Sequence, residues 1–544
     1  MEKKRGISGK RDILYAVICA VFFSVAMIFG AQLEQQGNVR FTSAGTWVGI
    51  AILFVCSTPA VWGLFYLMRL YDKRSGACKP FDAGGKQSPE FWMFTVLLLL
   101  CWMPYFFSSY PGYFLYDAQD ELNMIQTAEY TTHHPLAHVL LLGGVVKIVQ
   151  KITGSYNAGI AVYVVCQAVF AAMCFSFLFC RMKRWGVQRW ILVIGRIYVC
   201  IFPVVPMYVL CTTKDVLFTL FLLLFLVNVI ELAEFHTGSC IALVLNGTMM
   251  LLMRKNGVYA LVLSIPFLIA AARSERKKMT FSLLAVLAAY LVCSLGLKGL
   301  THADDHEKQE ILTIPIQQLA RVYNYEREAF NEGQTEALYQ FLPEKALLKY
   351  RAVLSDPVKV AFNSQAYEKD SGAFWKLWFQ VGVKKPASYL NAFLVNNYGF
   401  WYPYASLNCY QGNLVNTFVY EDSSYFGYET EPPGERRSLL PALDRFVRRL
   451  SLEISWQRIP GLRVLFHPAW YFWIFFFGIG EHLLRRRYRR VAYALPVCLL
   501  FLTVLLGPAV LVRYVLQFYF GFPLLLAFLF AGRKDDCRKG YETD

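Results

Sequence analysis

Hydrophobic residues along this chain gather in long runs that are separated by short polar stretches. A helix that crosses a bilayer needs about 20 mostly apolar residues, and its backbone groups must be hydrogen-bonded within the segment because lipid offers no partners. Each run is therefore expected to be a helix of an all-α integral membrane protein. The pattern predicts twelve spans, at residues 13–31, 46–69, 91–107, 157–180, 190–209, 215–233, 239–253, 256–272, 280–298, 466–484, 491–509 and 513–531.

Lysine and arginine between the runs predict the side on which each loop lies, because cytoplasmic loops carry an excess of these residues. If the N-terminus is cytoplasmic, every short basic loop and the basic C-terminal tail are cytoplasmic as well, provided that the apolar stretch 136–151 does not cross the membrane. That stretch is short, follows Pro135 and contains Lys147 and Lys151, so we expect a lateral helix on the outer face. The short basic loops are 70–90, 181–189, 273–279 and 485–490.

This topology divides the chain into four regions. Residues 1–90 form an N-terminal two-helix addition, and residues 91–298 form a transmembrane core with an outer loop at 108–156. Residues 299–465 are close to neutral overall and are predicted to be a mostly helical extracytoplasmic domain. Residues 466–544 supply the last spans and a basic tail. We therefore expect a multi-pass protein of the cell membrane with both termini in the cytoplasm.

Composition supports a membrane protein and argues against a nucleic-acid-binding one. Hydrophobic residues make up 56% of the chain and charged residues 17%, whereas soluble domains average about 25% charged. The net charge is +16, but the basic residues lie beside the apolar runs, where anionic lipid headgroups are the expected counter-charge. Of the fourteen cysteines, only Cys409 lies within 299–465, so a disulfide framework in that region is excluded.

Three acidic residues follow the span at 91–107: Asp117, Asp120 and Glu121. On a helix they would share one face, and a carboxyl group near the lipid boundary gains proton affinity unless a cation pairs with it. Such a set suits a general base, and Asp117 with Asp120 also suits binding of Mg²⁺ or Mn²⁺. A solvated loop that only caps a helix is the simpler alternative.

A histidine pair, His133 and His134, stands directly before Pro135. Neutral imidazole is a common metal ligand, and protonated imidazole binds phosphate. Proline is favoured in the first turn of a helix, so the pair also fits a cap for the lateral helix. Metal binding, phosphate binding and capping all remain open.

Charged residues also stand at three separate positions at the outer ends of spans. Lys214 and Asp215 begin one of these spans. Arg254 and Asn256 separate two others, and Arg513 begins the last. Lysine alone fits an interfacial anchor, but basic residues on the outer face oppose the usual charge bias, and guanidinium binds phosphate bidentately. Together with the acidic loop, these residues predict a carboxylate base that faces cations able to hold a phosphate.

These motifs resemble those of the GT-C class of membrane glycosyltransferases, which use polyprenyl-phosphate-linked sugars, and are most similar to a poorly characterised bacterial family of that class. The likeness covers most of residues 90–330. Two spans precede the one that leads to the acidic loop, so residues 13–69 are interpreted as an N-terminal addition. The shared features are the acidic first outer loop, His-His-Pro at 133–135, Thr-Lys-Asp at 213–215, Arg-x-Asn-Gly at 254–257 and IPIQQLAR at 314–321.

The resemblance implies a GT-C-like fold and sugar transfer from a polyprenyl-phosphate donor on the extracytoplasmic face. Asp117 would accept the proton of an acceptor hydroxyl that attacks the anomeric carbon with inversion. Asp120 or Glu121 would orient the acceptor or bind metal. Asn256 and the three cations, or Mg²⁺ or Mn²⁺, would stabilise the leaving phosphate. The expected partners are the lipid donor, the bilayer and an acceptor glycan, protein or lipid, without nucleic acid.

Aromatic residues between 391 and 428 offer surfaces that stack on sugar rings, or they form a belt at the membrane interface. These residues are Tyr398, Trp401, Tyr402, Tyr404 and Tyr410.

Three other functions fit the same sequence. A polymerase or ligase of lipid-linked glycans would use outer-face arginine and histidine rather than an acidic base. A transporter or flippase of lipid-linked saccharides fits twelve spans, although the chain lacks two matching halves. A scaffold protein without chemistry is the third, because each motif also has an ordinary interfacial explanation.

Overall fold

A computed structural model describes the chain apart from six short segments, and every regular element in the described part is a helix. It contains no β-strand there, only isolated bridges such as that between Tyr113 and Cys211. The predicted all-α fold is therefore confirmed. The described residues are 9–74, 89–305, 308–407, 430–452 and 455–530.

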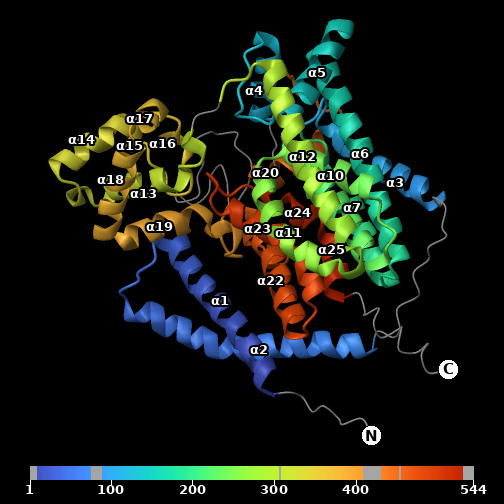
Figure 1. Ribbon diagram of the computed structural model, residues 1–544, viewed down its shortest axis with the longest axis horizontal. Coiled ribbons are helices and arrows are strands. Elements are labelled where there is room, and N and C mark those ends of the chain that lie inside the picture. Colours follow the sequence, from blue (N-terminus) through green and yellow to red (C-terminus); the bar gives the residue numbers. More distant parts are fainter. Residues whose placement is uncertain (1–8, 75–88, 306–307, 408–429, 453–454, 531–544) are drawn as a thin grey trace.

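Two long helices, α1 (Gly9–Gln36) and α2 (Ala44–Arg74), pack against each other as an N-terminal hairpin. They appear in blue in the lower part of Figure 1, where α2 lies along the edge of the molecule. The hairpin also contacts the C-terminal helices through α1.

The helical body is built around α9, which is apolar on all sides. Within Lys214–Phe235, 83% of the most apolar stretch is buried, as expected for a helix without a polar face. A π-helical turn, Glu231–Phe235, continues α9. The helices of the body are α3 (Pro89–Ser108), α4 (Tyr116–Thr127), α5 (Leu136–Thr153), α6 (Tyr156–Arg184), α7 (Arg189–Ile201), α8 (Val204–Val209), α9 (Lys214–Ile230), α10 (Cys240–Met253), α11 (Asn256–Ala271) and α12 (Arg276–Thr301).

Seven shorter helices form a lobe beside the body, drawn in yellow and orange in Figure 1. They share a hydrophobic core of their own, which includes Leu319, Leu338 and Phe374. The lobe occupies part of the predicted extracytoplasmic domain. Its helices are α13 (Thr313–Tyr325), α14 (Glu332–Phe341), α15 (Glu344–Leu347), α16 (Asp356–Lys359), α17 (Ser364–Lys369), α18 (Ser371–Lys384) and α19 (Pro386–Asn397).

The C-terminal helices return to the body and are bent at two points. The axis turns by 69° between α21 and α22, where Pro468 begins the second helix, and by 51° at Gly521. A Cβ atom at position 521 would lie 2.3 Å from the Gln517 carbonyl oxygen, so only glycine fits this bend. The elements are α20 (Pro441–Leu452), α21 (Pro460–Phe466), α22 (Pro468–Leu484), α23 (Tyr488–Val504), η7 (Val512–Val515), α24 (Leu516–Phe520) and α25 (Phe522–Phe530).

Seven of the described helices are long and apolar enough to cross a bilayer, or up to nine if each bent pair is one span. The chain is thus a multi-pass membrane protein, while the count of twelve stays a prediction. The expected span 190–209 is divided, because α7 ends at Ile201 before Pro203. Helix α5 also has the length and composition of a span, so its predicted lateral course remains untested.

Candidate functional site

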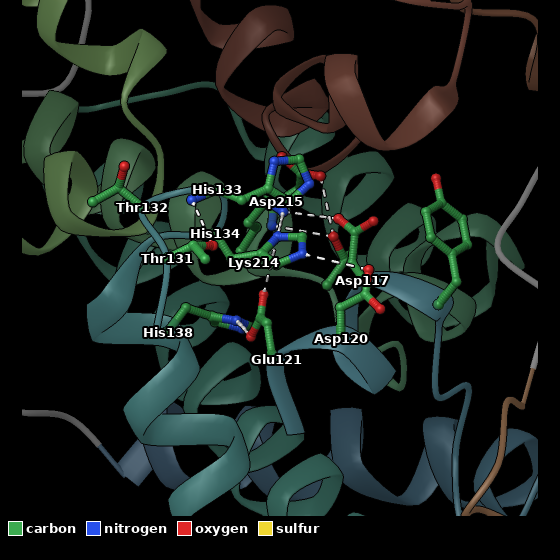
Figure 2. Close-up of polar contacts among 12 residues, drawn as sticks. Asp117, Asp120, Glu121, Thr131, Thr132, His133, His134, His138, Lys214 and Asp215 are labelled. Atoms are coloured by element: carbon green, nitrogen blue, oxygen red, sulfur yellow. Dashed lines mark hydrogen bonds and ion pairs between the residues drawn. The ribbon is translucent and has the colours of Figure 1, made fainter. Parts of the chain in front are cut away.

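Helix α4 carries the acidic residues of the first loop and packs against α5. Asp117 and Glu121, one turn apart, are both buried. The Asp120 side chain is 64% exposed. The expectation that the three carboxylates share one face therefore holds for Asp117 and Glu121, while Asp120 lies at the edge of the cluster (Figure 2).

Asp117 is held between two cations from distant parts of the chain. Lys214 Nζ donates to its Oδ2 at 2.8 Å, and Arg513 Nη1 donates to the same oxygen at 3.0 Å. Arg513 Nη2 also donates to the Tyr116 hydroxyl at 2.6 Å. Burial alone would raise the pKa of Asp117, but the positive charges of Arg513 and Lys214 hold this pKa well below its usual value. The carboxylate is therefore ionised and already paired.

Lys214 joins Asp117 to the histidine pair. Its Nζ lies 2.9 Å from His134 Nδ1 (Figure 2). An ammonium group has only donors, so Nδ1 accepts and the proton of the neutral ring lies on Nε2, 4.0 Å from Asp120 Oδ2. His133 is exposed, and its ring centroid is 4.4 Å from that of His134. The second histidine is thus part of the cluster, and the first stands at its rim.

A buried chain of hydrogen bonds leads from the acidic helix into α6. Glu121 Oε2 lies 2.5 Å from His138 Nδ1, and His138 Nε2 lies 3.0 Å from the Tyr163 hydroxyl. That hydroxyl donates to Gln167 Oε1 at 3.2 Å, and Gln167 Nε2 donates to backbone carbonyls of residues 209 and 211. The ionisable groups of this series of hydrogen bonds are almost fully buried. The series therefore fixes the position of Glu121 within the cluster.

The Arg-x-Asn-Gly arginine pairs with the aspartate of Thr-Lys-Asp. Arg254 Nη1 lies 2.9 Å from Asp215 Oδ1, and this aspartate side chain is 2% exposed. Thr213 Oγ1 donates to Asp215 Oδ2 at 3.1 Å. The Tyr514 ring connects this pair to the first one, because the guanidinium carbons of Arg254 and Arg513 lie 5.1 and 5.3 Å from its centroid.

The last two residues of that motif begin α11. Within the described part of the chain, the Asn256 side chain has no hydrogen-bond partner, so its phosphate-binding role stays a prediction. Gly257 has a clear packing role. A Cβ atom there would lie 3.1 Å from Leu251 Cδ2 and 3.1 Å from Phe218 Cε2, which leaves little room for any side chain.

The loop between α4 and α5 is fastened to neighbouring segments. Lys255 Nζ donates to the Thr132 carbonyl oxygen. Thr132 N donates to Asp304 O at 2.9 Å, and Asp304 N donates to Tyr130 O at 2.9 Å. These bonds hold the histidine pair close to the end of α12.

The donor set does not fit the predicted divalent metal. Among the described residues, no group of three or more His, Cys, Asp or Glu side chains is arranged to hold a metal ion. The Asp117 oxygens face cations, and Asp120 points to the rim. Mg²⁺ prefers a shell of oxygen ligands, which this cation-rich pair does not provide.

Two of the aromatic residues proposed to stack on sugars make hydrogen bonds within the fold. The Tyr398 hydroxyl donates to Glu34 Oε2 at 2.7 Å, and Trp401 Nε1 donates to Asn397 Oδ1 at 2.7 Å. Tyr404 is 50% exposed. Tyr410, like Cys409, lies outside the described residues. Contact with a sugar therefore remains untested for this group.

The structure thus brings together residues that are scattered over almost 400 positions of the sequence. The cluster contains Asp117, Asp120, Glu121, His133, His134, Lys214, Asp215, Arg254 and Arg513. Four members of the network were not predicted from the sequence: Tyr116, Tyr163, Gln167 and Tyr514. Only the i, i+4 spacing of Tyr163 and Gln167 within the apolar helix α6 gave a signal for any of them.

One family model matches residues 124–540, more than three quarters of the chain, and is described as a family of unknown function, DUF6020. No curated protein and no solved structure matches the chain.

Proposed function

Because the chain belongs to the DUF6020 family, whose function is unknown, we propose an activity from the site itself: a membrane glycosyltransferase that moves a sugar from a polyprenyl-phosphate donor to an acceptor hydroxyl. The observation that carries the proposal is the convergence of Lys214, Arg254 and Arg513 on one buried carboxylate-lined cluster. Ionisable groups at membrane depth are costly and are retained mainly for function.

Each of the three cations is already paired with one of two carboxylates. Lys214 and Arg513 share Asp117, and Arg254 has Asp215. A donor phosphate therefore enters by exchange, taking the place of a carboxylate at the cations. Arginine and lysine at 2.8–3.0 Å from the Asp117 oxygens already stand at the distance that charge-assisted bonds to a phosphate require.

This exchange would prepare the base. When Asp117 is paired with Lys214 and Arg513, as in this structure, their positive charges hold its pKa low, so Asp117 is a weak proton acceptor. When the donor phosphate takes Lys214 and Arg513, the proton affinity of Asp117 rises, because desolvation then acts without the opposing charges. Proton acceptance is thereby linked to the presence of the donor.

The proposed reaction is a single displacement. The acceptor oxygen forms a bond to the anomeric carbon as the bond from that carbon to the phosphate oxygen breaks, with inversion. The hydroxyl proton passes to Asp117, and the electron pair leaves on the polyprenyl phosphate, whose charge Arg513, Lys214 and Arg254 stabilise. We place this chemistry on the extracytoplasmic side, as the distribution of basic loops predicts.

A ligase or polymerase of lipid-linked glycans is the second candidate, and His134 is the observation that favours it. This buried imidazole lies 2.9 Å from Lys214 Nζ, one of the three cations. An arginine and histidine set of this kind can hold a diphosphate leaving group and move a proton.

Donor binding tests both proposals. Purified protein in detergent is heated with a panel of polyprenyl-phosphate and polyprenyl-diphosphate sugars, and the shift in Tm is recorded. The site variant is Arg254→Gln with Asp215→Asn, which removes a buried charge pair together and leaves no orphan charge. The matched control is Arg327→Gln with Glu344→Gln, an exposed pair 2.9 Å apart in the lobe.

We expect one monophosphate donor to raise the Tm of the wild type and the control, but not that of the site variant. Stabilisation by diphosphate-linked glycans alone would favour the ligase. Equal stabilisation of the wild type and the site variant by every donor would contradict the part that both proposals give to Arg254, because the donor phosphate would then bind without it.

A further inference from the structure

A second site lies toward the other end of α9. A cavity of about 390 Å³ opens between α9, α22, α23, α24 and α25, and it is lined from Leu222 to Phe235 along α9 and its π-helical turn. Lys214 begins the same helix. At 1.5 Å per residue, Lys214 and Ile230 are separated by roughly 24 Å, so the cavity is distinct from the Asp117 cluster.

The walls and the mouth of this cavity differ in chemistry. The walls are hydrocarbon and aromatic, with Leu226, Phe475 and Phe518 among them. Five arginines, exposed or half-buried, also belong to the lining, and Glu234 is the one acidic residue in it, so the solvent-facing part of the cavity, here called the mouth, is basic. The five are Arg273, Arg486, Arg487, Arg489 and Arg490.

The arginines do not all have the same role. Arg489 is built into the fold, since it donates to the carbonyls of Ala233 and Ala271 and lies 3.1 Å from Glu234. Arg273 and Arg486 are exposed beside it. These two guanidiniums add positive charge at the mouth, whereas Arg489 links helices to each other.

We propose that this cavity binds a phosphate-headed lipid, with one hydrocarbon chain inside and the phosphate at Arg273 and Arg486. Basic residues at helix ends commonly mark topology alone. Here they surround an apolar cavity, and basic pockets between membrane helices are the known form of anionic lipid sites. The volume falls within the range of ligand pockets, roughly 300–1,000 Å³. The inference is independent of the proposed glycosyl transfer.

Charge removal at the mouth is the first test. Wild-type protein, Arg273→Gln/Arg486→Gln and the control Arg276→Gln/Lys277→Gln are delipidated in detergent. The control removes two exposed charges from the neighbouring start of α12, outside the cavity lining. Phosphatidylglycerol, phosphatidylcholine and polyprenyl monophosphate are titrated, and the Kd of each is measured by native mass spectrometry.

Phosphatidylglycerol is expected to bind the wild type and the control equally, and the cavity variant about 30-fold more weakly, roughly fivefold for each lost charge. The same pattern with polyprenyl monophosphate alone would also support the site and identify the lipid as an isoprenoid carrier. Equal affinity for phosphatidylcholine, or no difference between the two variants, would overturn the proposal.

A substitution of Gln517 tests whether a hydrocarbon chain or a polar group occupies the interior of the cavity. This buried side chain lines the cavity, and its Nε2 has no hydrogen-bond partner among the described residues. A hydrocarbon chain gains nothing from that amide, so Gln517→Leu should keep or tighten phosphatidylglycerol binding. Loss of binding in this variant, with the fold intact by circular dichroism, would show a polar occupant and refute the lipid chain.

Discussion

The exchange of Asp117 for a phosphate predicts an unusual response to anions. Asp117→Asn keeps the shape of the side chain but removes the charge that balances Lys214 and Arg513, at 2.8 and 3.0 Å. Breaking a buried ion pair from one side costs about 3–5 kcal/mol. The asparagine oxygen still accepts one hydrogen bond, which returns about 1 kcal/mol. We therefore expect the free energy of unfolding to fall by about 2–4 kcal/mol.

Inorganic phosphate should restore part of this loss, because it offers the missing negative charge to the two cations. The assay is denaturant unfolding in detergent, followed by tryptophan fluorescence, with sodium phosphate or sodium chloride at equal ionic strength. Phosphate also stabilises proteins in general, so Asp120→Asn is the matched control. That carboxylate is 64% exposed, and its loss should change stability by less than about 0.5 kcal/mol.

The expected result is a phosphate effect that is larger in Asp117→Asn than in the wild type and in Asp120→Asn. If Asp117→Asn has wild-type stability, the buried pairing does not hold the cluster together. If phosphate acts equally on all three proteins, the cations around position 117 are not an anion site, and the exchange mechanism is wrong.

Three further perturbations test the rest of the cluster. Arg254→Gln alone should destabilise by about 3–5 kcal/mol, because it leaves Asp215 buried without its cation, and adding Asp215→Asn should recover much of that loss in a double-mutant cycle by denaturant unfolding. The pKa of Asp117 is lowered in the fold, so the ion pairs of Asp117 should stabilise the protein fully above the usual aspartate pKa of about 4 and lose this contribution as the pH falls further. The free energy of unfolding, measured between pH 3 and 7, should therefore decrease toward acid pH, and Asp117→Asn should reduce that decrease. His138→Leu should lower the free energy of unfolding by about 1–3 kcal/mol, because it leaves the buried Glu121 side chain without its imidazole partner. Wild-type stability in that variant would show that the hydrogen bonds from Glu121 into α6 do not stabilise the fold.

The sequence predicted most of the charged residues that meet, but not how they would pair. Charged groups at the ends of apolar runs are few and costly to bury, so Lys214, Arg254 and Arg513 were recognisable as a set. Their partners depend on tertiary packing. The acidic loop was expected to present free carboxylates, yet Asp117 is occupied by two cations, one of them 396 positions away.

Three features of the fold could not be predicted from hydropathy or residue spacing. Pro203 divides the run 190–209 and was visible in the sequence, but hydropathy over a long window averages across it. Tyr514 follows Arg513 directly and gave no periodic pattern, because its role comes from contact with two guanidiniums. Short helices such as α10 and α11 carry apolar runs that composition alone does not assign to a span.

The contact between the N-terminal hairpin and the lobe has a consequence for biogenesis. Val39 N donates to Asn391 Oδ1 at 2.7 Å, and Asn391 Nδ2 donates back to Val39 O at 3.2 Å, across 352 positions. At about 5–20 residues translated per second, roughly 20–70 s separate the synthesis of the two residues. Until Asn391 has been made, the backbone groups of Val39 need other partners, such as water or a chaperone. The ribosome thus completes the whole helical body before the first hairpin can dock.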